Sequence, residues 1–311
     1  MNRNSVAKFD STGFGLRSNP VASLLLAFFF SALIEAQGNG LPDRSAIVEA
    51  MKKAALFFEH ELSVEGGYAS SWDEATGRGF SEHRDGYAVI SIQPHGTTTV
   101  GLAMLRAFVE TGEALFLDGA EGAVSALVES QLASGGWEAD FVFEPDFIEG
   151  RFLRRDLENG EKKAEKQRDV SSLDDDKTTS ALRLLLEFVH TEGVPENESA
   201  ERALTFGMNS LLGNQYQNGG WPQRFSAPFP SGGPVFAASL PKAWPRQWPN
   251  ESYGSYVTLN DGNLENVMEL LLRAEILTGE SRYREAATRL GDFLLLAQLP
   301  APQRGWAQQY N

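Results

Sequence analysis

Apolar residues recur along most of this chain at the spacing of an amphipathic helix. Leu264, Val267, Met268, Leu271 and Leu272 follow one another at i, i+3, i+4, i+7 and i+8, which places them on one face of a helix. Similar runs are Ala286, Leu290, Phe293 and Leu294; Val100, Met104, Leu105 and Phe108; Val124, Leu127 and Val128; Leu182, Leu185, Leu186 and Val189; and Leu204, Met208, Leu211 and Leu212. The pattern predicts three helical hairpins in series.

The hairpins belong to an internal repeat. Trp137, Trp221 and Trp306 recur at intervals of about 85 residues, and Gln131, Gln215 and Gln298 keep the same step. Because a single hairpin cannot bury its apolar stripe alone, successive hairpins must stack. We therefore predict an all-α fold, an (α/α) toroid of repeated helical hairpins. A ring of such pairs needs further helices to close, so we expect it to be incomplete at the C-terminal end of this chain.

The first residues have the pattern of a secretory signal. Basic residues precede an apolar run over Val21–Ile34, and the small residue Ala36 follows. The run is short for a membrane span, which takes about 20 residues, and polar residues come directly after it. We expect a signal peptide over 1–36, a partial toroid domain over 37–311, a secreted or periplasmic location, and no stable membrane insertion after cleavage.

Composition and net charge exclude several kinds of functional site and partner. The chain has no cysteine, which excludes disulfides, thiolate metal sites and cysteine nucleophiles. Its formal net charge of −15 repels nucleic acid. An acidic polysaccharide would then have to bind through local cations or a bridging metal. We expect no nucleic-acid partner, and a monomer.

Polar clusters precede the first helix of each hairpin. They are His95-Gly96, Asp174-Asp175-Asp176 and Asn260-Asp261-Gly262, and their equivalent positions place them at one end of the fold. Carboxylate and amide oxygens are the ligands of Ca²⁺. For the two aspartate-containing clusters in register we predict metal or substrate binding, and the candidate metal ligands are Asp174, Asp175, Asp261 and Asn260. Asp and Asn also favour helix N-caps, so capping stays open for any single residue; for His95 we favour a structural role.

A second set of candidates follows the second helices, in GGWPQRF and RGWAQQY. Aromatic rings can stack on sugars, and amides or guanidinium groups can bind hydroxyls and carboxylates. The expected substrate-binding residues are Lys177, Trp221, Gln223, Arg224 and Trp306, although tryptophans at such positions also fill cores. The loop Pro228–Gly254 is expected to form a wall of the site, and Arg151–Arg168 is interpreted as a solvated surface linker.

The segments SLDDDKTTSALRLLL, NQYQNGGWPQRF, TLNDGNLENVMELLL and GWAQQYN resemble, in order, motifs of the family 10 polysaccharide lyases, the pectate lyases. The resemblance covers roughly Ile92–Asn311 and implies an (α/α) toroid that cleaves polygalacturonate by calcium-assisted β-elimination. It implies calcium-binding aspartates in the clusters Asp174-Asp175 and Asn260-Asp261. It also implies an arginine base, which we expect to lie beyond Asn311, so that this chain by itself lacks the base.

Three other functions remain open from the sequence. The glycine–tryptophan repeats with an aspartate triplet also resemble squalene-hopene-type terpene cyclases, but Leu173 stands where their Asp-x-Asp-Asp motif has its first aspartate. A uronide or glycoside hydrolase would use two carboxylates, such as Asp175 and Asp261, as acid and base. A non-catalytic polysaccharide-binding protein would cleave nothing. The products discriminate, because a lyase leaves an unsaturated end and a hydrolase a saturated one.

Overall fold

A computed structural model describes residues 43–226, 235–239 and 253–310. The expected signal peptide and most of the loop Pro228–Gly254 lie outside these residues. The chain divides into two units, residues 1–51 and 52–311, and the helix α2 (Arg44–Phe57) begins in the first and ends in the second. In the described part of the chain, none of the helices has both the length and the apolar character needed to cross a membrane.

The three hairpins predicted from the apolar pattern are present in the second unit. They are α3 (Thr97–Thr111) with α4 (Ala114–Ser130), α7 (Lys177–His190) with α8 (Glu198–Gly213), and α9 (Asn263–Thr278) with α10 (Ser281–Ala297). Shorter elements are a π-helical turn at Phe58–Leu62, α5 (Pro145–Glu149), α6 (Arg154–Glu158), and 3-10 turns at Asp174–Asp176 and Tyr253–Ser255.

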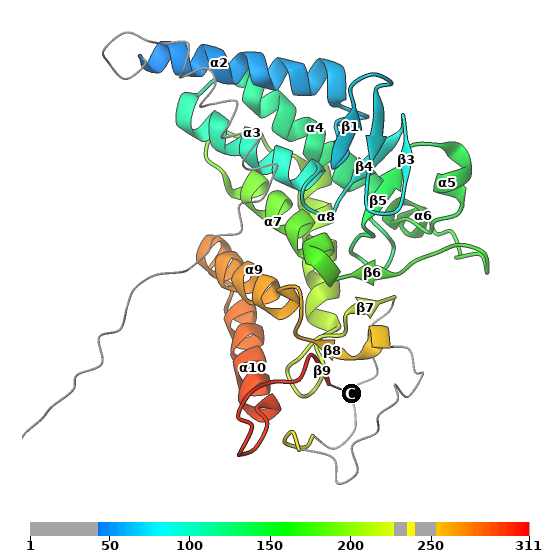
Figure 1. Cartoon of the computed structure of the whole chain (residues 1–311), viewed down its shortest axis with the longest axis vertical. Coiled ribbons are helices and arrows are strands. Elements are labelled where there is room, and N and C mark those ends of the chain that lie inside the picture. The colour runs from blue at the N-terminus through cyan, green and yellow to red at the C-terminus, as the bar shows by residue number, and fades with distance from the viewer. Residues whose placement is uncertain (1–42, 227–234, 240–252, 311) are drawn as a thin grey trace, which may run out of the picture. The chain divides into compact units, whose positions relative to one another are not determined.

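The hairpins pack in two layers. The first helices lie side by side, with α7 between α3 and α9 (Figure 1), and α4 contacts α8 in the second layer. Because α7 has neighbours on both sides, most of its residues are buried, including Leu182, Leu184 and Leu185. Gly101 lets α3 approach closely, since a Cβ there would lie 2.5 Å from the Leu184 side chain. This arrangement is that of an (α/α) toroid, as the sequence predicts.

Short antiparallel strand pairs join the ends of each hairpin, a feature that the helical pattern does not predict. In each repeat, the strand before the first helix pairs with the strand after the second. The pairs are β4 (Val89–Ser91) with β5 (Asp140–Val142), β6 (Ser171–Ser172) with β7 (Arg224–Phe225), and β8 (Val257–Thr258) with β9 (Gln309–Tyr310). The polar clusters and the Gly-Trp turns are thus held at one end of the hairpins.

The chain before the first hairpin forms a three-stranded antiparallel sheet that the sequence pattern did not predict. Its strands are β1 (Ser71–Asp73), β2 (Arg78–Phe80) and β3 (Asp85–Gly86). The interpretation of Arg151–Arg168 as a solvated linker is wrong for its first part. Arg151, Phe152, Leu153 and Arg154 are buried, and Arg151 donates to Glu138 at 2.7 Å, so this part packs onto the fold and only the part that follows is exposed.

The repeated glutamines connect one hairpin to the next. The buried Gln131 amide donates to the Ala203 carbonyl of α8 at 3.0 Å, and Gln215 makes the equivalent bond to Ala286 of α10 at 2.9 Å. Each bond joins the end of one hairpin to the second helix of the following one. The glutamine periodicity therefore has a structural cause, because at each stacking step the amide nitrogen of a glutamine donates a hydrogen bond to the next hairpin.

The glycines of the Gly-Gly-Trp turns permit the same stacking. Gly135 and Gly219 have φ values of +99° and +95°, and a Cβ on Gly219 would lie 2.0 Å from the Arg289 carbonyl of α10. An L-residue is strained in this conformation and has no room here.

Gly219→Ala should therefore lower the free energy of unfolding by roughly 3 kcal/mol, because it combines a strained φ with a backbone clash. The matched control is Gly77→Ala. Gly77 has φ +69°, but a Cβ added there would meet no heavy atom within 4 Å, so only the strain of about 1 kcal/mol applies. Chemical denaturation measures both; equal losses in the two variants would contradict the close-packing interpretation.

Candidate metal centre and its cleft

The two acidic clusters occupy the same turn in successive repeats. Helix α7 begins at Lys177 and α9 at Asn263. The two residues before each helix have positive φ: Asp175 (+50°) and Asp176 (+61°) in one repeat, Asp261 (+55°) and Gly262 (+71°) in the other. Asp175 and Asp261 are therefore structurally equivalent. Asp, Asn and Gly tolerate this left-handed conformation better than other residues, which explains the residue types at these positions.

The N-cap explanation for these clusters is wrong. The residues at the cap positions are Asp176 and Gly262, and neither makes a side-chain capping bond. The Asp176 carboxylate instead accepts a hydrogen bond from Thr179 Oγ1 and pairs with Arg183 at 3.1 Å. Asp174 and Asn260 lie one position further from the helix than Asp175 and Asp261, and their side chains line the cleft described below.

The structure brings together the three carboxylates predicted as metal ligands. One oxygen each from Asp174, Asp175 and Asp261 lies within 4.8 Å of the others. Asn260, the fourth predicted ligand, donates its amide nitrogen to Asp261, while its Oδ1 atom is buried without a hydrogen-bond partner among the described residues. A ligand set made only of oxygens, with an orphaned amide oxygen beside it, fits a hard divalent cation such as Ca²⁺.

A cleft of about 420 Å³ opens over this centre. Amide side chains complete its lining, which consists of Asp174, Asp175, Gln223, Asn260, Asp261, Gln308 and Gln309. Gln223 donates to Asp174 Oδ1 at 2.7 Å and leaves its own Oε1 buried without a partner among the described residues. Gln309 reaches Thr258 Oγ1 at 3.4 Å. The cleft thus presents carboxylates and amides from several segments of the chain.

Lys177 lies among the carboxylates of Asp174, Asp175 and Asp261, which we call the acidic centre, instead of facing substrate. The residue is only 4% exposed. Its Nζ atom lies 3.5 Å from Asp174 Oδ2, 3.7 Å from Asp175 Oδ2 and 3.5 Å from Glu82 Oε2. The substrate-binding role expected for Lys177 is therefore corrected, because its charge is already engaged by carboxylates. Glu82, in the turn between β2 and β3, was not selected from the sequence, since it lies outside the repeats.

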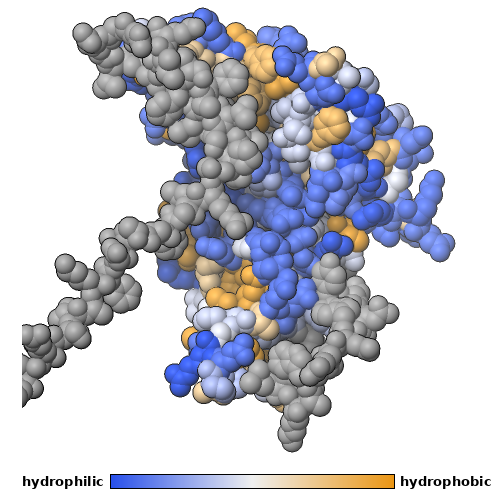
Figure 2. Space-filling model, in the orientation of Figure 1, coloured by the Kyte–Doolittle hydropathy of each residue, from blue (hydrophilic) through white to orange (hydrophobic). Residues whose placement is uncertain are grey.

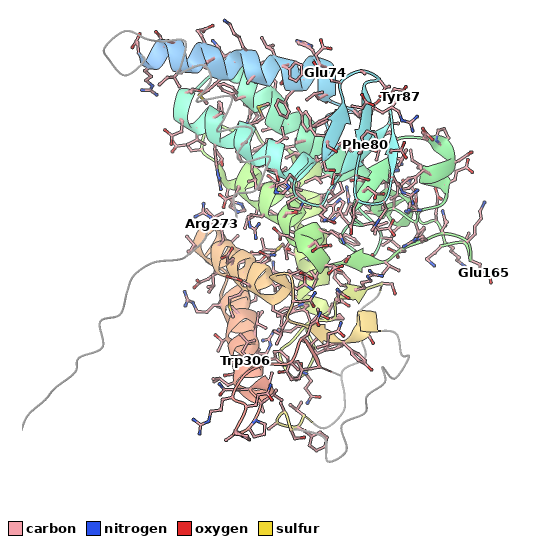
Figure 3. All side chains as sticks on the ribbon, in the orientation of Figure 1. Glu74, Phe80, Tyr87, Glu165, Arg273 and Trp306 are labelled. Carbon is pink, nitrogen blue, oxygen red and sulfur yellow. The ribbon has the colours of Figure 1, made fainter. Side chains whose placement is uncertain are left out.

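The tryptophans of the Gly-Trp turns are structural in two repeats. Trp137 and Trp221 are 1% and 0% exposed, and their indole nitrogens donate to the carbonyls of Leu127 and Leu211. The expectation that Trp221 contacts substrate is wrong, because no part of its ring is exposed for stacking. Trp306 makes the equivalent bond to Leu294 but is 51% exposed beside α10 (Figure 3).

Arg224 remains a candidate for contact with an anionic ligand. It is exposed on β7, directly after the cleft residue Gln223. Gln309 holds the equivalent strand position in the next repeat, since Arg224 pairs with Ser172 and Gln309 with Thr258. The sequence pattern did not single out Gln309. It lies one repeat length after Arg224, and that spacing is the signal that identifies it.

Burial, together with the crowding of carboxylates, raises the pKa of Asp175. Burial is the largest cause, and the neighbouring Asp174, Asp261 and Glu82 raise the pKa further, while Lys177 lowers it. The folded state therefore binds a proton at Asp175 more readily than the unfolded chain does. Ionised Asp175 destabilises the metal-free fold, and stability falls as pH rises from the ordinary aspartate range through the raised pKa.

Asp175→Asn should consequently raise the unfolding temperature at pH 7 in the presence of chelator, because the amide removes the charge and tolerates the positive φ. The gain should disappear at a pH below the ordinary aspartate pKa, where the wild-type carboxyl is protonated in both states. Thermal unfolding followed by circular dichroism measures the difference. A gain that is independent of pH would mean that electrostatic crowding is not its cause.

A family model and several solved structures match this chain. Residues 146–277 match the model of a family described as pectic acid lyase. No curated protein matches the sequence. Among solved structures, a mutant family 10 polysaccharide lyase from Cellvibrio cellulosa in complex with trigalacturonic acid is 13% identical, with a TM-score of 0.46 over 76% of this chain. A second structure of a family 10 lyase from that organism is 14% identical, with a TM-score of 0.45 over 88% of this chain.

A cellobiose 2-epimerase from Spirochaeta thermophila is 15% identical, with a TM-score of 0.49 over 86% of this chain and 57% of its own. This chain spans 65% of the length of the first lyase and 70% of the second. The segment that the family model matches includes Asp174, Asp175, Lys177, Gln223, Asn260 and Asp261. The resemblance to the pectate lyases is therefore confirmed over residues 146–277, the segment that carries the acidic centre.

Proposed function

We propose that this chain is part of a secreted or periplasmic pectate lyase that binds polygalacturonate at a calcium centre and cleaves it by β-elimination. One observation carries the proposal: Asp174, Asp175 and Asp261, from equivalent turns of two repeats, converge within 4.8 Å in the lining of a cleft. The family match over the same residues supports a lyase. The pattern of residues 1–36 supports export, and the chain is expected to act as a monomer.

The acidity of the protein explains why a cation is needed. The chain has a formal charge of −15, and Figure 2 shows mainly hydrophilic residues on the described part of the face in view. A polyuronate that approaches three carboxylates is repelled unless positive charge lies between them. Asp174, Asp175, Asp261 and Asn260 would hold Ca²⁺, which would offset the repulsion of substrate carboxylates and stabilise negative charge that develops during proton removal.

Polar side chains of this chain would orient the bound substrate. Gln223 and Asn260 have buried amide oxygens without partners among the described residues, and Gln308 and Gln309 line the cleft from the third repeat. These amides can bind sugar hydroxyls, and exposed Arg224 can pair with a uronate carboxylate. We assign no catalytic base, because the titratable residues that line the described cleft are the carboxylates of the proposed metal centre.

Hydrolysis is the second candidate, because the raised pKa of Asp175 is the feature that a general acid requires. A hydrolase needs one protonated carboxyl and one carboxylate at the scissile bond. Here a third carboxylate and the buried Lys177 ammonium lie in the same cluster. Such a cluster suits cation binding better than acid–base pairing. Ultraviolet absorption of the products separates the two, since only elimination gives an unsaturated end.

Asp261→Asn should weaken calcium-dependent binding of trigalacturonate by at least about tenfold, because it removes one of three charged ligands while the amide keeps the left-handed turn. Calorimetry with Ca²⁺ and then with chelator measures the loss. The matched control is Asp292→Asn, which removes the same charge from an exposed site on α10. Equal binding by both variants, or wild-type binding that chelator does not change, would contradict the metal centre.

A further inference from the structure

The amino group of Lys177 occupies the centre in which the calcium site is proposed. The residue is more than nine-tenths buried, and its amino group lies within 3.7 Å of three carboxylates, those of Asp174, Asp175 and Glu82. A lysine that served only to cover apolar surface would extend its ammonium toward water. Here the ammonium is turned inward, where it supplies one positive charge to a cluster of negative ones.

The lysine is specific to this repeat. The first residue of the first helix is Thr97 in the first hairpin, Lys177 in the second and Asn263 in the third. All three are buried, so the fold accepts small polar side chains at this position. A requirement of the toroid framework therefore does not explain the lysine. The acidic centre beside it does, because Asp174 and Asp175 belong to the same turn.

A cation within the centre has two opposite effects on a divalent ion. It holds the carboxylates together when no metal is bound, because it offsets their repulsion. It also repels the incoming ion, since two positive charges then share the same few ångströms. Lys177 and the metal thus compete for the same carboxylates, and any group that draws the ammonium away from Asp174 and Asp175 favours the metal.

Glu82 is such a group. It comes from the turn between β2 and β3, outside the repeats and outside the segment that the family model matches. Its carboxylate lies 3.5 Å from the Lys177 amino group, and the same oxygen lies 3.4 Å from His83 Nε2. Glu82 thus provides an anchor for the ammonium that is separate from the predicted metal ligands.

We propose that Lys177 is a positioning residue, a built-in counter-cation that holds Asp174 and Asp175 in the metal-free protein, and that Glu82 sets the calcium affinity by retaining the ammonium when the ion binds. The proposal rests on the proposed calcium site but concerns different residues. It assigns Glu82 a role that acts through Lys177 and not by contact with the ion.

The experiment measures Ca²⁺ alone, by calorimetry and by the rise in unfolding temperature with Ca²⁺ concentration. Lys177→Met keeps most of the length of the side chain and removes its charge. It should bind Ca²⁺ about tenfold more tightly and unfold at a lower temperature than the wild type in chelator. Lys177→Arg, which restores the charge, should return both values toward the wild type. Calcium affinity that is unchanged or weaker in Lys177→Met overturns the proposal.

Glu82→Gln tests the second part with a variant of a partly exposed residue. It should weaken Ca²⁺ binding about threefold, because the ammonium then pairs only with Asp174 and Asp175. Glu74→Gln is the matched control, since Glu74 is an exposed glutamate in the turn between β1 and β2 of the same small sheet (Figure 3). In a double-mutant cycle, the effect of Glu82→Gln should vanish in the Lys177→Met background. An equal effect in both backgrounds would show that Glu82 acts through its own field, which overturns its assigned role.

Failure of the calcium site and failure of this proposal give different results. If the wild type shows no response to Ca²⁺, the metal centre is wrong. The counter-cation role is then decided by unfolding in chelator, where Lys177→Met must lose stability and Lys177→Arg must regain it. Equal unfolding temperatures for the wild type and Lys177→Met would overturn that role on their own.

Discussion

Like charges concentrated at one point are the constraint on which this site depends. Three carboxylate oxygens within 4.8 Å repel one another, and burial together with this repulsion raises the pKa of Asp175. Such a cluster persists only when the surrounding fold holds it and when positive charge compensates it. The stacked hairpins supply the first condition, because each acidic turn is fixed between a strand pair and a helix. Lys177 supplies part of the second, and a divalent cation would supply the rest.

The repeat explains how two distant segments came to share one centre. Asp175 and Asp261 occupy the same left-handed position before α7 and α9, and these helices are neighbours in the first layer. Stacking by one repeat therefore places equivalent side chains next to each other. The glutamine bonds and the close glycine turns fix that step, so packing contacts outside the cleft lining help to set the separation of its carboxylates. A substitution at Gly219 would therefore shift Asp261, because it would move α10 and the helix α9 that follows Asp261.

Periodicity predicted the parts of the structure that repeat. The six long helices of the hairpins follow from the apolar spacing, and the convergence of Asp174, Asp175 and Asp261 follows from the register of their turns. The repeat pattern did not predict how buried a side chain is at an equivalent position of each repeat. Trp221 and Trp306 hold equivalent places, yet one is fully buried and the other half exposed, because the turn that carries the first packs against Val257 of the following repeat. Glu82 could not be found, since it approaches Lys177 from a small sheet that lies outside the repeats.

The first repeat shows why the framework alone does not make a metal centre. His95 stands where the other repeats have Asp175 and Asp261, and Thr97 stands where the second has Lys177. Asp140 occupies the strand position of Arg224, but it is buried and accepts from Arg84 at 2.8 Å. The Asp140 carboxylate of this repeat is thus paired with an arginine of the fold. The second and third repeats leave theirs only partly compensated, and an incompletely neutralised cluster beneath a cleft is what a cation from solution can complete.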